Sequence, residues 1–154
     1  MKHKIISIPP VYFLTVYFLT CIIITLLLHV LVSNLNWIGF PFTLVGVAFL
    51  GAGTYWIART HRLLTQHATP VTFVPSTCII QGGLYHYSRN PMYVGFVVFL
   101  IGCSVLSGNI LSVLSPLCFF VVLDRMFIPY EEEKMESTFG KEYLEYRRKV
   151  RRWL

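Results

Sequence analysis

The 154-residue chain is 55% hydrophobic and only 13% charged, which excludes an ordinary soluble protein, and its length limits it to a single domain. The formal net charge of +6 does not indicate nucleic-acid binding, because the basic residues are not interleaved with any recognisable nucleic-acid-binding motif. The composition predicts an all-α integral membrane protein, with four transmembrane helices and a cytoplasmic amphipathic C-terminal helical tail.

The first two spans are expected within residues 1–58, where no Asp, Glu, Lys or Arg occurs after Lys4. One span needs about 20 apolar residues, so the stretch holds two, which we place at residues 11–32 and 37–58. Close packing against another helix or a ligand is expected at three glycines of the second span, Gly46, Gly51 and Gly53.

A helical hairpin is predicted over residues 91–128, after a loop over residues 59–90. Its first helix should begin at Pro91, because proline is favoured at the first helical position, and end near Leu106. Such a helix of about 15 residues reaches only about 22 Å, so a partly inserted hairpin is the alternative to a full crossing. The second helix should run from residue 110 through residue 128.

Basic residues predict the orientation of the chain in the membrane. Lys and Arg occur before the first span, within the loop over residues 59–90 and from Arg125 onward, whereas the turns at residues 33–36 and 107–109 carry none. Because basic segments stay on the cytoplasmic side, four spans place both termini and this loop in the cytoplasm.

The tail over residues 129–154 has a helical stripe of apolar side chains. The stripe consists of Met135, Phe139, Tyr143, Tyr146, Val150 and Trp153. Gly140 should mark a break between two short helices. The stripe indicates either an amphipathic helix lying on anionic lipid or a helix packed against the spans.

The motif over residues 83–95 suits a small ligand at the membrane surface. Its glycines, and the amides that open a helix at Pro91, can bond a ligand through the backbone. Flat faces for a ring come from Tyr85, Tyr87 and Tyr93. Arg89 can hold a carboxylate in a two-pronged contact.

Two acidic residues after the last span, Glu131 and Glu132, should return to the same side of the membrane. Their carboxylates can accept hydrogen bonds from ribose hydroxyls or an ammonium group, so the two motifs together suit a ligand with an adenine, a ribose and an amino acid. Arg89 and these glutamates also suit a structural ion pair at the helix ends, and the residues alone favour that interpretation. No metal site is predicted, because the four cysteines form no CxxC pair and the histidines are irregularly spaced.

Both motifs resemble those of the membrane methyltransferases of the isoprenylcysteine carboxyl methyltransferase and phospholipid methyltransferase group. The first is matched by Gly83, Tyr85, Tyr87, Arg89, Asn90, Pro91, Tyr93 and Gly95. The second is matched by Glu131, Glu132, Phe139, Gly140, Tyr143, Tyr146, Arg152 and Trp153. The resemblance covers roughly residues 79–154. Asn90 stands where many members have His, and Met135 where Leu is usual.

This resemblance implies transfer of a methyl group from S-adenosylmethionine to a lipophilic acceptor in the bilayer, either the carboxylate of a prenylated-cysteine-like substrate or a lipid amine. The implied cofactor-binding residues are Tyr85, His86, Tyr87, Asn90, Pro91, Tyr93, Glu131 and Glu132, and the implied catalytic residues are Arg89 and Glu132. Two alternatives stay open: a sterol-reductase-like oxidoreductase that uses NADPH, and a non-catalytic membrane or lipid-binding subunit.

Overall fold

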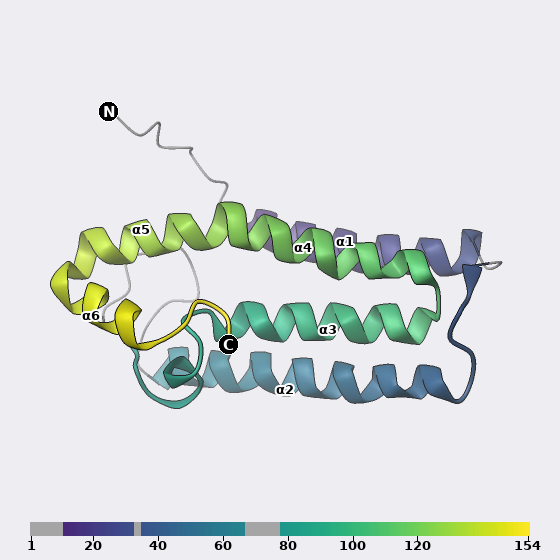
Figure 1. Cartoon of the computed structure of the whole chain (residues 1–154), viewed down its shortest axis with the longest axis horizontal. Coiled ribbons are helices and arrows are strands. Elements are labelled where there is room, and N and C mark those ends of the chain that lie inside the picture. The colour runs from purple at the N-terminus through teal and green to yellow at the C-terminus, as the bar shows by residue number, and fades with distance from the viewer. Residues whose placement is uncertain (1–10, 33–34, 67–77) are drawn as a thin grey trace.

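The computed structural model describes residues 11–32, 35–66 and 78–154, which are largely helical. The helices are α1 (Val11–Leu31), α2 (Val45–Gln66), α3 (Pro91–Ser107), α4 (Leu114–Val122), α5 (Ile128–Phe139) and α6 (Lys141–Lys149). Short 3-10 turns cover Phe42–Leu44, Gly83–His86 and Ile110–Val113, and a π-helical turn, Leu123–Phe127, joins α4 to α5. The long helices lie side by side, and α3 packs against α1, α2 and α4 (Figure 1).

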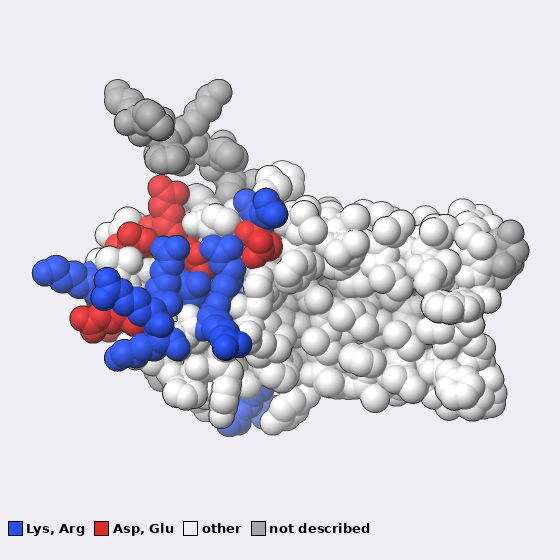
Figure 2. Space-filling view, in the orientation of Figure 1, with Lys and Arg blue, Asp and Glu red and all other residues white. Residues whose placement is uncertain are grey.

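Three helices of the described part are long and apolar enough to cross a membrane, over Phe13–Leu31, Phe42–Gln66 and Ile110–Phe139. Helix α3 is apolar too but has only 17 residues. The Lys, Arg, Asp and Glu side chains gather at one end of the molecule, and the remaining length of the visible face is uncharged (Figure 2). The chain is therefore an integral, multi-pass membrane protein.

Helix α2 lies further along the chain than the apolar stretch predicts. It begins at Val45 instead of Trp37 and ends at Gln66 instead of Ala58, so the predicted bounds are wrong at both ends. Pro41 delays the start, because proline donates no backbone hydrogen bond and restricts the residue before it. The polar residues after Ala58 are compatible with a helix, so α2 continues beyond its apolar part.

The last long helix also runs further than predicted, because the helix does not stop near Ile128 but continues to Phe139. Its π-helical turn ends at Phe127, two residues before Pro129. Proline has no N–H to donate and its ring crowds the preceding turn, and a wider turn accommodates both effects.

This wider turn also sets which side chains of the helix face the protein interior. Phe119, Leu123 and Ile128 are fully buried and Glu132 nearly so, at successive steps of four, five and four residues. The five-residue step spans the π-helical turn, so all four residues share one face. The turn thereby carries the buried face of α4 on to the acidic residues of α5.

Glycines bring α2 and α3 into backbone contact. A Cβ added at Gly53 would lie 2.6 Å from the backbone nitrogen of Phe99, and one added at Gly46 would lie 2.7 Å from the carbonyl oxygen of Gly102. Close packing is thus confirmed at these two glycines. The expected packing against another helix is wrong for Gly51, where an added Cβ would meet no protein atom within 4 Å.

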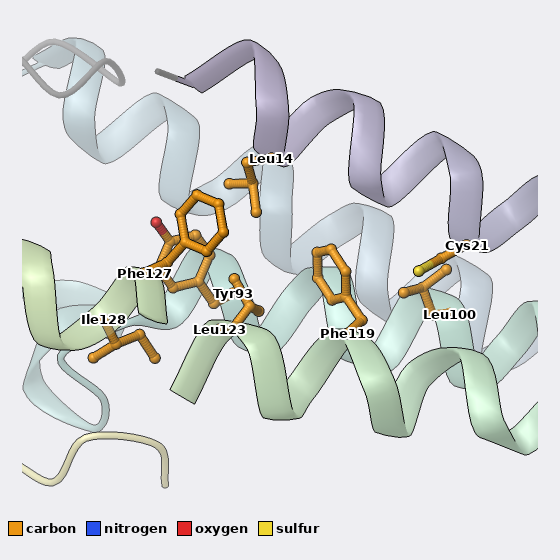
Figure 3. Packing of buried hydrophobic residues seen from close by; sticks show 8 residues of the cluster. All are labelled: Leu14, Cys21, Tyr93, Leu100, Phe119, Leu123, Phe127 and Ile128. Atoms are coloured by element: carbon orange, nitrogen blue, oxygen red, sulfur yellow. The ribbon is translucent and has the colours of Figure 1, made fainter. Parts of the chain in front are cut away.

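The main hydrophobic core lies between α1, α3 and the α4–α5 helix. Leu100 and Phe119 are fully buried at its centre, beside Cys21 of α1 (Figure 3). Tyr93 and Phe127 belong to the same cluster, towards the charged end of the bundle. The core therefore extends to the residues of the predicted site.

The charged side chains lie at one end of the bundle (Figures 1 and 2), and a polar network joins the helices at the other end. Asn109 donates to the carbonyl oxygen of Val32 at 2.6 Å and accepts from a backbone amide of its own turn. The hydroxyl of Ser107 donates to that of Ser112 at 2.8 Å, and the Nδ1 of His29 lies 2.7 Å from the carbonyl oxygen of Ser107. These bonds tie α1 to the α3–α4 hairpin.

The C-terminal tail folds back on the protein. Gly140, with a φ of 52°, separates α5 from α6, which confirms the predicted break. The stripe residues Tyr143, Tyr146 and Val150 are buried against a partly buried set, Ile79, Met135 and Phe139. The stripe of α6 therefore packs against protein, and the alternative that it lies on lipid is not supported for these three residues.

Candidate functional site

A buried ion-pair cluster joins the loop before α3 to α5 and the C-terminal residues. Nη2 of Arg89 lies 3.1 Å from Oε1 of Glu132, and Nη2 of Arg152 lies 2.8 Å from Oε2 of the same carboxylate. The side chains of Arg89 and Glu132 are only 9% and 7% exposed. Nε of Arg152 also donates to Oε1 at 3.3 Å, so two guanidinium groups compensate the burial of this acid.

Backbone contacts fix the position of Arg89. Its amide donates to the carbonyl oxygen of Arg151 at 2.9 Å. The side-chain amide of the next residue, Asn90, donates to the carbonyl oxygen of Arg152 at 3.0 Å. The hydroxyl of Ser88 accepts from the amide of Asn90 and donates to that same carbonyl of Arg152. The loop and the C-terminal residues therefore form one hydrogen-bonded unit.

A second link between the two motifs uses tyrosines. The hydroxyl of Tyr93, on the first turn of α3, donates to Oε1 of Glu131 at 2.8 Å. The hydroxyl of Tyr146 donates to the carbonyl oxygen of Tyr85 at 2.7 Å. The expectation that the loop and the acidic pair are neighbours is confirmed by these contacts and by the pair of Arg89 with Glu132.

Three tyrosines near the cluster, Tyr85, Tyr143 and Tyr146, stay protonated at neutral pH. Burial raises the pKa of the Tyr85 and Tyr146 hydroxyls well above the ordinary tyrosine value, and burial together with the nearby Glu132 raises the pKa of Tyr143. The pKa of Arg152 is raised, chiefly by its hydrogen bond to Glu132. These groups keep their protons, so the cluster has fixed donors and a fixed cation.

Arg89 has unused hydrogen-bonding capacity. Its Nε and Nη1 are buried and find no acceptor among the described residues. A buried charged donor left without an acceptor costs more than the about 1–3 kcal/mol of a neutral group. Each of these two N–H groups can donate a charge-assisted hydrogen bond to an anionic oxygen, so the residues present fit a ligand that carries a carboxylate.

The predicted loop residues divide into a buried and an exposed group. Asn90, Pro91 and Tyr93 are buried at the start of α3, as the ion-pair cluster is. The side chains of His86 and Tyr87 are exposed and meet edge to face, with ring centroids 5.3 Å apart. No described contact joins these two rings to Glu131 or Glu132, so the structure does not bring them into the buried cluster.

Asp124 is a residue of this region that sequence reasoning missed. It accepts hydrogen bonds from Nε1 of Trp153 at 2.9 Å and from Nη1 of Arg152 at 3.3 Å. The sequence did contain a signal for this residue, because Asp124 is a lone acidic residue near the end of an apolar span. A charge at such a position is costly unless it has a partner. Arg152 had been predicted through the family motif, and Trp153 through that motif and the apolar stripe of the tail.

An open hollow of about 470 Å³ lies beside the ion-pair cluster. Three acidic residues of α5, Glu132, Glu133 and Glu136, line it together with Arg147 and Arg152. Glu136 and Arg147 form an exposed ion pair at 3.3 Å within this hollow. The buried cluster is thus reached from a surface that carries charges of both signs.

In its described part the chain is a helical membrane protein whose candidate site is assembled from a loop, an acidic helix and the C-terminal residues. Residues 41–142 match the family described as phospholipid methyltransferase. Because this match covers more than half of the chain, the protein belongs to that family of membrane methyltransferases, and the resemblance drawn from the two motifs is confirmed.

Individual relatives agree with this placement. Over 75 residues the chain is 40% identical to protein-S-isoprenylcysteine O-methyltransferase of Schizosaccharomyces pombe and 36% identical to protein-S-isoprenylcysteine O-methyltransferase B of Arabidopsis thaliana. Each match covers 47% of this chain but only 30% and 36% of those two proteins. An uncharacterized protein of Haemophilus influenzae is 40% identical over 63 residues, which are 41% of this chain and its own whole length. No solved structure matches the chain.

Proposed function

We propose that the chain transfers the methyl group of S-adenosylmethionine to a lipophilic acceptor that reaches the charged end of the bundle from the bilayer. Membership of the family supports this proposal. The observation that carries it is the meeting of both family motifs in one buried cluster, where Arg89 keeps two donors unused. The acceptor is proposed to be the carboxylate of a prenylated-cysteine-like substrate or a lipid amine.

The proposed cofactor residues follow from the chemistry of the cluster. The free donors of Arg89 would hold a carboxylate of the cofactor or the acceptor. Glu131, which the hydroxyl of Tyr93 orients, would accept from a ribose hydroxyl or an ammonium group. The ring of Tyr85 would lie against the adenine. The first turn of α3, which Asn90 and Pro91 open, and the exposed His86 and Tyr87 would complete the binding surface from the loop.

S-adenosylmethionine supplies, when bound, an activated methyl group on its sulfonium. The protein's own contribution is alignment and exclusion of water, which an in-line displacement chiefly needs. Glu132 acts in this proposal by holding Arg89 in one orientation through their 3.1 Å ion pair. A carboxylate acceptor needs no base, whereas an amine acceptor must lose a proton, for which Glu132 or His86 is the candidate.

The finer topology is also part of the proposal. We infer that α3 crosses the membrane together with the three longer helices, so that residues 1–154 form one four-span domain with both termini and the site in the cytoplasm. The gathering of charged side chains at one end of the bundle supports this orientation (Figure 2). Labelling of single cysteines from each side of sealed vesicles, at positions in the loop and at the opposite end, would test it.

The decisive experiment incubates purified protein in lipid nanodiscs with methyl-labelled S-adenosylmethionine and a total membrane lipid extract. We expect label in a lipophilic product, and binding of S-adenosylmethionine in a titration, while NADPH gives no binding. Binding of NADPH in place of S-adenosylmethionine would favour the sterol-reductase-like alternative. Neither binding nor transfer would leave the non-catalytic subunit as the better reading.

A further inference from the structure

The last five residues, Val150–Leu154, cover the loop before α3, and we call them the C-terminal strap. The backbone turns from helical to extended at Val150, with φ −117° and ψ 134°. The strap then lies beside the start of α3 (Figure 1). Its carbonyl oxygens at Arg151 and Arg152 accept the three hydrogen bonds from Ser88, Arg89 and Asn90 described above.

The strap is anchored at its other side by Asp124. One carboxylate oxygen, Oδ1, accepts from both Trp153 at 2.9 Å and Arg152 at 3.3 Å. The ring of Trp153 also packs on Phe120, with centroids 4.6 Å apart. Asp124 lies within the π-helical turn, a rare local structure that often occurs at functional sites. One acidic residue therefore orients two consecutive side chains of the strap.

A continuous chain of charged contacts leads from this anchor to the site. Asp124 holds Arg152, Arg152 holds Glu132 at 2.8 Å, and Glu132 holds Arg89 at 3.1 Å. The strap supplies a second connection, because its carbonyl oxygens fix the backbone of Arg89 and the side chain of Asn90. Both the backbone and the guanidinium of Arg89 thus depend on a strap that Asp124 anchors.

We propose that Asp124 is a positioning residue, which sets the orientation of Arg89 through the C-terminal strap and Arg152 without touching the ligand itself. The consequence for ligand affinity rests on the proposed function. The consequence for the strap does not, because it concerns contacts within the chain alone. The two consequences can be measured separately.

The first test is amide hydrogen exchange of the full-length protein in nanodiscs, with no ligand added. In Asp124→Asn we expect exchange in the peptide containing Arg89 to rise about tenfold, because the strap's hydrogen bonds open more often. Trp153→Phe keeps the stacked ring and removes one bond to Asp124, so a smaller rise is expected. The matched control is Arg125→Gln, which removes an 81% exposed partner 3.7 Å from the same carboxylate and should leave exchange unchanged.

The second test is a double-mutant cycle on S-adenosylmethionine affinity. Asp124→Asn alone should weaken binding about tenfold, whereas in an Arg152→Gln background it should add less than that, because only the bond from Trp153 to Asp124 is then left to lose. If Asp124→Asn acted only by lowering the general stability of the fold, it would reduce affinity by the same factor in the wild-type and Arg152→Gln backgrounds. Helical circular dichroism of each variant shows whether it is folded.

Three results would overturn the proposal. They are unchanged exchange at Arg89 in folded Asp124→Asn, an equal rise in the Arg125→Gln control, and additive losses of affinity in the cycle. Absence of S-adenosylmethionine binding in the wild type would contradict the proposed function while the exchange experiment still decided the role of Asp124. Should Asp124→Asn fail to fold, Trp153→Phe decides, since unchanged exchange there would count against the anchor.

Discussion

The two ends of the helical bundle both bury polar groups, but they bury them differently. At the end with Asn109 and Ser107, the described hydroxyl and amide groups find partners within the protein. At the charged end, Arg89 is paired with Glu132 and still leaves two buried donors without an acceptor in the described part of the chain. The role of a fully hydrogen-bonded network is structural, because it joins helices. A buried charged cluster with donors that lack an acceptor indicates a ligand-binding site instead.

Among variants that test this difference between the two ends, Glu132→Gln is expected to lose the most stability. The change leaves the buried guanidinium of Arg89 without a carboxylate and leaves Arg152 with Asp124 alone, and loss of one partner of a buried ion pair costs about 3–5 kcal/mol. Thermal unfolding in detergent micelles measures this loss. The matched control is Glu136→Gln, whose ion pair with Arg147 is exposed, so its cost should be no more than about 1 kcal/mol. Equal losses in the two variants would contradict the distinction.

Arg89→Gln should separate binding from stability at the charged end. Glu132 keeps Arg152 as its partner in this variant, so stability should fall less than in Glu132→Gln. Affinity for S-adenosylmethionine should fall about 10- to 100-fold, the equivalent of about 1.4–2.8 kcal/mol for lost charged hydrogen bonds. Calorimetric titration measures the affinity, with exposed Arg148→Gln as the control. Wild-type affinity in Arg89→Gln would remove this residue from the proposed site.

Asn109→Ala should show the opposite pattern at the other end. The variant loses the bonds to the carbonyl oxygens of α1 and the one from the amide of Leu111, which together should cost about 1–3 kcal/mol of unfolding free energy. Affinity for S-adenosylmethionine should not change in the folded variant. The same unfolding and titration measurements apply, and a selective loss of affinity with unchanged stability would contradict a purely structural role of this end.

The smallest effect is expected for Tyr93→Phe, which removes one hydroxyl and keeps the buried ring. Loss of the hydrogen bond to Glu131 should reduce stability by about 1–2 kcal/mol. Affinity for S-adenosylmethionine should fall by up to about tenfold, if the hydroxyl orients Glu131 as proposed. Ser107→Ala at the other end removes one hydroxyl too and serves as the control. A similar loss of affinity in both variants would break the comparison.

Local sequence signals predicted the helix boundaries where a single residue constrains the backbone. Pro91 begins α3, and Gly140 separates α5 from α6, both as expected. Hydropathy predicted the helix ends less well, because it shows which part of a helix is apolar and not where the helix ends. For that reason α2 was placed too early, and the continuation of the last long helix through Pro129 was missed.

By itself the sequence determined the membrane class, the family and the proximity of the two motifs. These properties depend on the length of apolar stretches, the spacing of motif residues and the order of the spans, which can all be taken directly from the sequence. Which charges meet was decided only by the tertiary structure. Asp124, Glu132 and Arg152 are joined because the π-helical turn extends the buried face of α4 and because the strap folds back over the loop. Pairing of distant buried charges depends on how the helices pack, which no local pattern specifies.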